Sequence, residues 1–245
     1  MGRFRGLIKL VPGAVVTYRA LRRAELVLSE VLGVTPPRAS SSRAYWEQRA
    51  AGYRDEVEQA LGRGDLLVRA QREFLAELAR IDWDSLIEIG CGFGWHLRAI
   101  APISEGKRLT GGDYSRAQLE QAQAYLAGCR VGLCQLDASC LPFTDGAFDV
   151  VLTSGTLVCI PPDDLPQVLR EMRRVARRFV IAIEYAREHM DTPARCQLMR
   201  FAEWYGHDFG DAFRRAGLRV LESRRLSAYN GHDARVPLSY ILAEV

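Results

Sequence analysis

One segment of the chain constrains its fold more than any other: an apolar run that ends in a glycine-rich turn. From Leu86 to His96 the residues read LIEIGCGFGWH, so that Gly90, Gly92 and Gly94 stand at alternate positions. Glycine tolerates positive φ and lets the backbone approach a ligand closely, and the first turn of a helix offers free N–H groups. The pattern predicts a strand, a tight turn that meets a ligand, and a helix. A glycine-rich connection without a ligand is the alternative.

Strand-length apolar runs alternate with helical patterns after this point. Strands are expected at Ser85–Ile89, Arg108–Asp113, Arg130–Leu136, Phe148–Thr153 and Arg178–Glu184, and intervening helices at Trp95–Ile100, Ser115–Leu126 and Leu165–Ala176. This alternation predicts βαβ units and a parallel sheet. Two last runs, Leu218–Leu226 and Val236–Val245, are separated by Asn230-Gly231 without room for a crossover helix, so they should pair antiparallel.

These elements predict an α/β fold, a doubly wound seven-stranded mixed sheet with an N-terminal helical extension. In the extension, apolar residues recur at helical spacing between Val15 and Leu32, and Pro36-Pro37 prevents the helix from continuing. A polar stretch, 39–42, follows. We therefore expect two parts, an amphipathic helical extension and linker at 1–42 and a ligand-binding domain at 43–245.

Acidic residues stand at the ends of three successive predicted strands. Glu88 lies two residues before the first glycine of the turn, Asp113 ends the second strand, and Asp137 follows the third. A carboxylate about 20 residues after a glycine turn can accept hydrogen bonds from both ribose hydroxyls. The alternative for Asp113 is an N-cap of the next helix. A nicotinamide dinucleotide fold is a rival, but its fingerprint places the third glycine where Trp95 stands.

The G-x-G-x-G spacing after Glu88 resembles the first motif of class I S-adenosylmethionine-dependent methyltransferases, of the small-molecule type. The resemblance spans roughly 45–186 and implies a Rossmann-like methyltransferase fold, S-adenosyl-L-methionine as cofactor and a methyltransferase domain at 43–245. It implies that Glu88 contacts the methionine ammonium, Asp113 the ribose and Asp137 the adenine amino group. The cofactor-binding residues it implies are Tyr53, Glu88, Gly90, Cys91, Gly92, Gly94, Asp113, Tyr114, Asp137, Ala138, Thr153 and Ser154.

The segment after the fourth strand bears on the methyl acceptor. It lacks the Asn/Asp-Pro-Pro-aromatic motif of enzymes that methylate adenine or glutamine amines, and the Pro-Cys of cytosine enzymes. It resembles the small-molecule type, although Cys159 stands where that type commonly has histidine. We expect a small-molecule acceptor that attacks through oxygen, such as a sugar or a secondary metabolite. A protein or RNA acceptor, and a non-catalytic regulatory protein that binds the cofactor, remain alternatives.

Candidates for a catalytic base follow the fifth strand. His207 lies in a segment dense in aromatic residues, Trp204–Phe209, which would suit a lidded pocket. Glu184 and Tyr185, at the end of the fifth strand, are further candidates. In the alternative interpretation, a helix packs these aromatic residues into the core and His207 caps it.

Charge and composition narrow the partners. A net charge of +3 in 245 residues is too mild to indicate nucleic acid, so none is expected. The six cysteines form no CxxC pair, so no metal site is expected. No run approaches the length of a membrane span, and Lys9 and Pro12 interrupt the apolar start, so we expect a cytoplasmic protein. The N-terminal helix could cover the pocket, lie on an anionic membrane surface or contact a partner subunit. The oligomeric state stays open.

Overall fold

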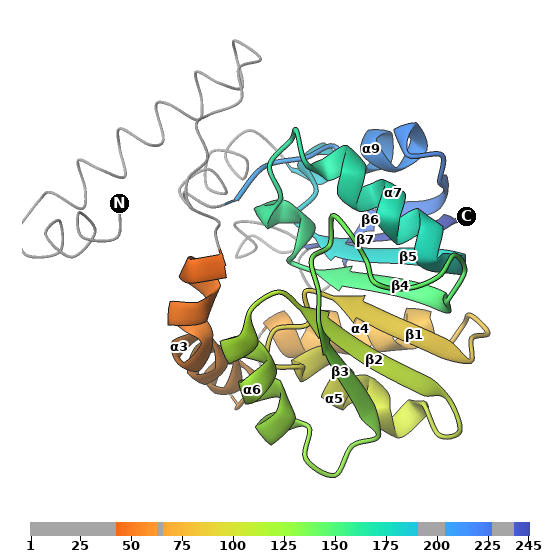
Figure 1. Cartoon of the computed structure of the whole chain (residues 1–245). Coiled ribbons are helices and arrows are strands. Elements are labelled where there is room, and N and C mark those ends of the chain that lie inside the picture. The colour runs from red at the N-terminus through yellow and green to blue at the C-terminus, as the bar shows by residue number, and fades with distance from the viewer. Residues whose placement is uncertain (1–42, 63–65, 191–203, 227–237) are drawn as a thin grey trace, which may run out of the picture.

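The computed structural model describes residues 43–62, 66–190, 204–226 and 238–245. Within these ranges seven strands form one sheet in the order β3-β2-β1-β4-β5-β7-β6 (Figure 1). The strands are β1 (Ser85–Ile89), β2 (Arg108–Asp113), β3 (Val131–Gln135), β4 (Phe148–Ser154), β5 (Ala176–Glu184), β6 (Arg219–Arg225) and β7 (Ser239–Glu244). The helices are α3 (Arg43–Gly62), α4 (Leu66–Leu78), α5 (Trp95–Ile100), α6 (Arg116–Tyr125), α7 (Leu165–Val175) and α9 (Phe209–Arg215), with short 3-10 helices η1 (Ala101–Ile103), η2 (Leu157–Cys159) and η3 (Arg187–His189).

The sheet is mixed, as the sequence predicted. Strands β1 to β5 run parallel to one another, and β7 lies antiparallel between β5 and β6. The antiparallel pairing of the last two runs is therefore confirmed. The chain winds outward from β1 to β3 and then from β4 to β5, so the order reverses between β1 and β4. Ligands of doubly wound sheets bind outside the carboxyl ends of the strands at such a reversal.

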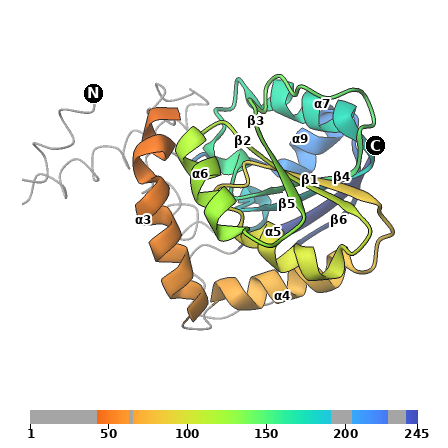
Figure 2. The ribbon, with the colours of Figure 1, turned by 60° about the horizontal axis from the view of Figure 1, so that its bottom comes forward.

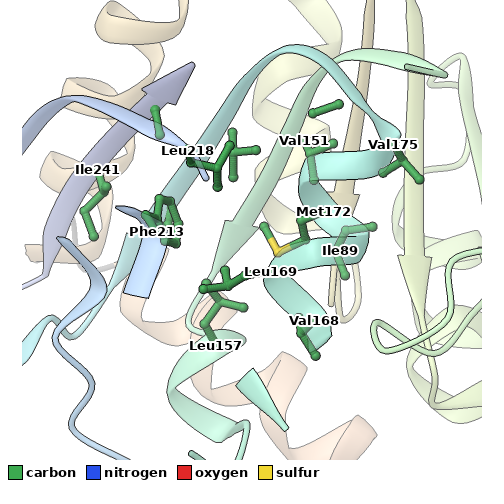
Figure 3. Packing of buried hydrophobic residues seen from close by; sticks show 14 of the residues in the cluster. Ile89, Val151, Leu157, Val168, Leu169, Met172, Val175, Phe213, Leu218 and Ile241 are labelled. Atoms are coloured by element: carbon green, nitrogen blue, oxygen red, sulfur yellow. The ribbon is translucent and has the colours of Figure 1, made fainter. Parts of the chain in front are cut away.

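Helices cover both faces of the sheet. On one face α7 and α9 bury apolar residues, and Figure 3 shows Met172 of α7 beside Ile89, with Phe213 of α9 in the part of the cluster that contains Ile241. On the other face α4, α5 and α6 bury Phe74, Leu97, Ala122 and their neighbours (Figure 2). Because β1 and β4 are covered on both sides, nearly every residue of each is buried. This double burial explains their continuous apolar sequence.

Helix α3 lies alongside α6 (Figures 1 and 2). The Glu47 carboxylate accepts hydrogen bonds from the backbone N–H groups of Arg116 and Ala117, at 2.8 and 2.9 Å, at the start of α6. A negative charge is favourable there because the helix N-terminus carries unpaired N–H groups. The Arg54 guanidinium lies 5.3 Å from the ring centroid of Tyr125. These contacts hold the α3 side chains near the carboxyl ends of the strands.

Several predictions fall outside the described residues. They are the N-terminal extension at 1–42 and most of the connection between β6 and β7. None of the described helices is long and apolar enough to cross a membrane.

Candidate functional site

The glycine turn has the strained geometry that its sequence predicts. Gly90, Gly92 and Gly94 have φ values of 73°, 54° and 84°, a region that side chains other than glycine rarely occupy. A Cβ atom at Gly90 would lie 2.3 Å from Thr156 Oγ1, so that position also lacks room for a methyl group. The Gly90 and Cys91 N–H groups donate to the Gly112 carbonyl, at 2.7 and 3.0 Å. The turn is thereby held against the end of β2.

A cavity of about 620 Å³ opens beside this turn, at the carboxyl ends of β1, β2, β3 and β4. Its volume lies within the range of small-molecule sites. Its wall consists of Trp46, Tyr53, Glu88, Ile89, Gly90, Cys91, Gly92, Trp95, Asp113, Tyr114, Gln118, Leu136, Asp137, Ala138, Ser139, Ser154, Gly155, Thr156, Cys159, Ile160, Pro161, Asp163, Asp164, Gln167 and Val168. Ten of the twelve residues predicted to bind the cofactor are in this wall. Among the described residues, no lysine, arginine or histidine lines it.

Glu88 presents an unsatisfied carboxylate to the cavity. Its side chain is 2% exposed, and its Oε2 atom has no hydrogen-bond partner among the described residues. Burial, and then the nearby Asp113 carboxylate, raises the pKa of Glu88 well above its usual value. A buried carboxyl without a partner is costly, and a cationic ligand group would satisfy it.

Asp113 holds the turn and still has capacity for a ligand. Its Oδ2 atom accepts from the Gly92 N–H at 2.9 Å and its Oδ1 atom from the Ser115 N–H at 2.9 Å. Two carboxylate oxygens offer about four acceptor sites, so further donors can be bound. Burial raises the pKa of Asp113, while the backbone N–H donors oppose that rise. Asp113 is not the N-cap of α6: that residue is Ser115, which accepts from the Gln118 N–H at 3.2 Å.

The third acid lies at the same edge of the sheet. Asp137 accepts from the backbone N–H and the hydroxyl of Ser139, at 2.8 and 2.6 Å, and it lines the cavity with Ala138 and Tyr114. The three acids thus lie at the carboxyl ends of β1, β2 and β3 in turn.

Gln118 is a residue of the site that sequence reasoning missed. Its side chain is 1% exposed and lines the cavity, and neither amide atom has a partner among the described residues. Its position was readable, because Gln118, Ala122 and Leu126 are four residues apart and share a buried helix face. A buried amide with no partner indicates a ligand that supplies one.

Aromatic side chains form another part of the wall. Tyr53 packs edge-to-face with Trp46, with ring centroids 5.5 Å apart, and with Phe93, at 5.9 Å. Trp95 also lines the cavity. Burial and the carboxylate of Glu88 raise the pKa of Tyr53, so its hydroxyl stays protonated. Cys159 lies in the wall as well.

Two predicted cofactor contacts are not in the wall. Thr153 is fully buried in β4 and does not line the cavity. Gly94 begins α5, and a Cβ atom there would lie 2.7 Å from Leu126 Cδ1. Gly94 therefore allows close packing between α5 and the end of α6 instead of contact with a ligand.

The three candidates for a catalytic base, His207, Glu184 and Tyr185, also lie outside the cavity wall. His207 is 7% exposed, and its Nε2 atom lies 2.8 Å from the Ile160 carbonyl. Burial lowers the pKa of His207 to about 4. Asp208, rather than His207, caps α9 by accepting from the Asp211 N–H at 2.9 Å. His207 therefore joins two loops as a neutral buried side chain.

Glu184 and Tyr185 also form their contacts with other parts of the protein. Glu184 is fully buried and accepts from the backbone N–H groups at the start of η2, those of Thr156 and Leu157 at 3.0 Å and that of Val158 at 3.2 Å. Burial raises the pKa of Glu184 to about 7, although these donors oppose the rise. The Tyr185 ring stacks on Trp204, with centroids 4.7 Å apart.

A glycine turn and three acids at the ends of successive parallel strands define a nucleoside-binding α/β domain with its site at the sheet reversal. Residues 86–178 match the family described as a methyltransferase domain. The matched segment contains the glycine turn and the three acids on which the resemblance to class I S-adenosylmethionine-dependent methyltransferases rests.

The chain is similar to a curated relative and to two solved structures. The demethylmenaquinone methyltransferase of Roseiflexus castenholzii is 32% identical over 120 residues, which are 48% of this chain and 47% of that protein. The match thus spans about half of the relative's length. The methyltransferase of Haloferax volcanii, solved in complex with the Trm112 activator, aligns with a TM-score of 0.63 at 18% identity, over 81% of this chain and 96% of that one. A methyltransferase of Aquifex aeolicus aligns with a TM-score of 0.52 at 18% identity, over 65% and 81%. At these identities the solved structures show the fold alone.

Proposed function

We propose that this chain transfers the methyl group of S-adenosylmethionine to a small molecule that attacks through an oxygen atom. The observation that carries the proposal is Glu88, a buried carboxylate with an unpartnered oxygen that faces the cavity. The methionine end of the cofactor bears an ammonium group, which supplies the missing cation. In this proposal residues 43–245 form the catalytic domain.

Each part of the cofactor has a matching group in the wall. Asp113 has spare acceptor sites for the ribose hydroxyls, and Gln118, on the helix that follows, can exchange hydrogen bonds on the same side. Asp137 and Ala138 lie where the third strand ends and would meet the adenine. The order of β3, β2 and β1 in the sheet then becomes the order of adenine, ribose and methionine along the cavity.

The rest of the wall favours a small acceptor with an apolar surface. Trp46, Tyr53, Trp95 and Ile160 supply aromatic and aliphatic surface, which excludes water from the reacting atoms. The bound cofactor supplies an electrophilic methyl group, so the protein mainly orients the acceptor. The curated relative is named for a small-molecule substrate, demethylmenaquinone, which supports the same size class.

The wall also bears on how the acceptor loses its proton. Among the described residues no imidazole or amine lines the cavity, and His207 and Glu184 are committed elsewhere. Carboxylates such as Asp163 do line it, and a sugar hydroxyl would need one of them as its base, whereas an acidic phenol or enol attacks with little help. We therefore favour a phenol- or enol-like secondary metabolite over a sugar.

Two measurements test the proposal. Native mass spectrometry of the purified protein, with and without added S-adenosylhomocysteine, should show a complex of one adenosyl ligand per chain. A turnover assay with radiolabelled methyl donor should then transfer label to a member of a panel of phenols and enols. Binding without transfer to any small molecule, protein or RNA would favour the non-catalytic alternative. Absence of binding would refute the proposed function.

A further inference from the structure

One buried histidine near the cavity, His96, has no role in the function proposed above. His96, in the first turn of α5, is 2% exposed and does not line the cavity. Its Nε2 atom lies 2.8 Å from the hydroxyl oxygen of Ser154, which does line the cavity at the end of β4. The Phe74 and Trp95 rings pack against the imidazole, with centroids 5.6 and 3.7 Å away. The imidazole therefore contacts the Ser154 hydroxyl from outside the cavity wall.

The surroundings of His96 determine which nitrogen carries the proton. Burial lowers the pKa of His96 to about 3, so the ring is neutral at physiological pH and has one N–H group. Its Nδ1 atom has no partner among the described residues. A buried N–H group without a partner is rarer than an unpaired acceptor, so the proton belongs on Nε2. The Nε2–H group then donates to the Ser154 oxygen, and the Ser154 O–H is left to donate into the cavity.

Most backbone hydrogen-bond donors of the glycine turn and of the segment after β4 are already paired within the protein. In the glycine turn, the N–H groups of Gly90, Cys91, Gly92 and Gly94 all donate to protein oxygens. After β4, the N–H group of Gly155 donates to the Ile183 carbonyl at 2.9 Å, and that of Thr156 donates to Glu184. No lysine or arginine of the described residues lines the wall. Besides the N–H groups in the first turn of α5, side-chain donors such as the Ser154 hydroxyl can therefore serve an anionic ligand group beside β1 and β4.

We propose that His96 is a positioning residue that turns the Ser154 hydroxyl toward the carboxylate of the cofactor's methionine end. This inference rests on the proposed function, because it assigns a partner to one group of the same cofactor. Glu88 and Ser154 lie on adjacent strands, β1 and β4, so the cofactor's ammonium and carboxylate meet separate groups at the reversal of the sheet. Gln118 follows β2 and lies on the ribose side.

The experiment compares three ligands by isothermal titration calorimetry. At the methionine end, S-adenosylhomocysteine has both the ammonium and the carboxylate group. Decarboxylated S-adenosylmethionine has the ammonium without the carboxylate, and methylthioadenosine has neither. Ser154→Ala should weaken S-adenosylhomocysteine by about ten- to one-hundredfold, the range for a hydrogen bond to a charged group. The affinities of the other two ligands should stay within about twofold of their wild-type values. His96→Phe keeps an aromatic ring against Phe74 but removes the N–H donor, so it should produce the same pattern with a smaller loss of about three- to tenfold.

His96→Gln provides the rescue, because its amide nitrogen can reach the position of Nε2 and donate to Ser154. It should restore S-adenosylhomocysteine affinity to within about threefold of the wild type. Gln118→Leu is the matched control and should weaken all three ligands alike, since all contain the ribose.

The outcomes are distinct. An equal loss for methylthioadenosine in Ser154→Ala would show a structural role and overturn the inference, as would unchanged S-adenosylhomocysteine binding. If His96→Phe does not fold, His96→Leu, which also lacks the N–H donor, takes its place: a loss confined to the ligand with a carboxylate supports positioning, and unchanged or uniformly changed binding of all three ligands overturns it. Failure of the wild type to bind any of the three would refute the proposed function instead.

Discussion

Replacement of Glu88 by glutamine tests the central feature of the site. Glu88→Gln keeps the shape of the side chain and removes its charge. If the carboxylate meets the cofactor's ammonium, the lost interaction is a hydrogen bond between charged groups, worth about 1.5–3 kcal/mol. At about 1.4 kcal/mol for each tenfold change, S-adenosylhomocysteine should bind about 10- to 150-fold more weakly. Methylthioadenosine, which lacks the ammonium, should bind the variant and the wild type equally.

The same substitution should stabilise the ligand-free protein. Burial raises the pKa of Glu88 above its unfolded value, so the folded state binds a proton more tightly than the unfolded state. Stability contributed by the protonated form is fully present below the unfolded pKa of about 4.3 and is lost as the pH rises through the folded pKa. Glutamine cannot ionise, so the variant should have a higher melting temperature than the wild type at pH 7 and a flatter pH dependence.

Ligand affinity should follow pH in the opposite sense. The bound ammonium favours the ionised carboxylate, so wild-type binding releases a proton while Glu88 is protonated in the free protein. Affinity should therefore rise with pH between 5 and about 7.5, below the range in which the ligand's amino group loses its charge. Glu88→Gln should reduce that rise, leaving any contribution from Asp113. Calorimetry in two buffers of different ionisation enthalpy measures the proton directly.

Two results would refute the reasoning. An equal loss for both ligands would mean that Glu88 shapes the glycine turn rather than contacting the ammonium. Unchanged affinity together with a higher melting temperature would mean that the cofactor's ammonium lies elsewhere.

Three further predictions concern other parts of the domain. Asp113→Ala should weaken every adenosine ligand by about 1.5–3 kcal/mol in calorimetry, because the ribose is common to all of them; unchanged affinity in a folded variant would contradict the ribose assignment. Gly90→Ala should lower the melting temperature more than Gly106→Ala, since both glycines have positive φ but only Gly90 would place a methyl group 2.3 Å from Thr156 Oγ1; equal losses would show that Thr156 moves aside freely. His207→Ala should lower the free energy of unfolding by about 2–4 kcal/mol in urea titrations while turnover per folded chain stays near the wild-type value; a hundredfold loss of turnover with normal stability would restore His207 as a base. Because the folded pKa of His207 is lowered to about 4, its stabilising contribution is present above about pH 6.5 and is lost as the pH falls through 4, and His207→Ala should remove that part of the pH dependence.

Local sequence was sufficient for most of the fold. The bounds of β1, β2 and α5 agree with the prediction at both ends, because each is a short apolar or helical run between strong turn residues. The antiparallel β6–β7 pair was predictable since the connection is too short for a crossover helix. The three acids could be placed together because parallel strands carry their carboxyl ends to one edge of a sheet.

The acceptor side depended on contacts that sequence spacing does not show. Trp204–Phe209 has the composition of a pocket wall, yet the His207 ring is directed to a carbonyl 47 residues earlier. His96 had no visible role in the sequence, yet it contacts Ser154 across 58 residues of chain. The periodicity of a strand or helix fixes which side chains share a face. His96 lies next to the cavity wall, whereas His207 joins two loops. This difference depends on packing between segments that are distant in sequence, so only the tertiary structure decided it.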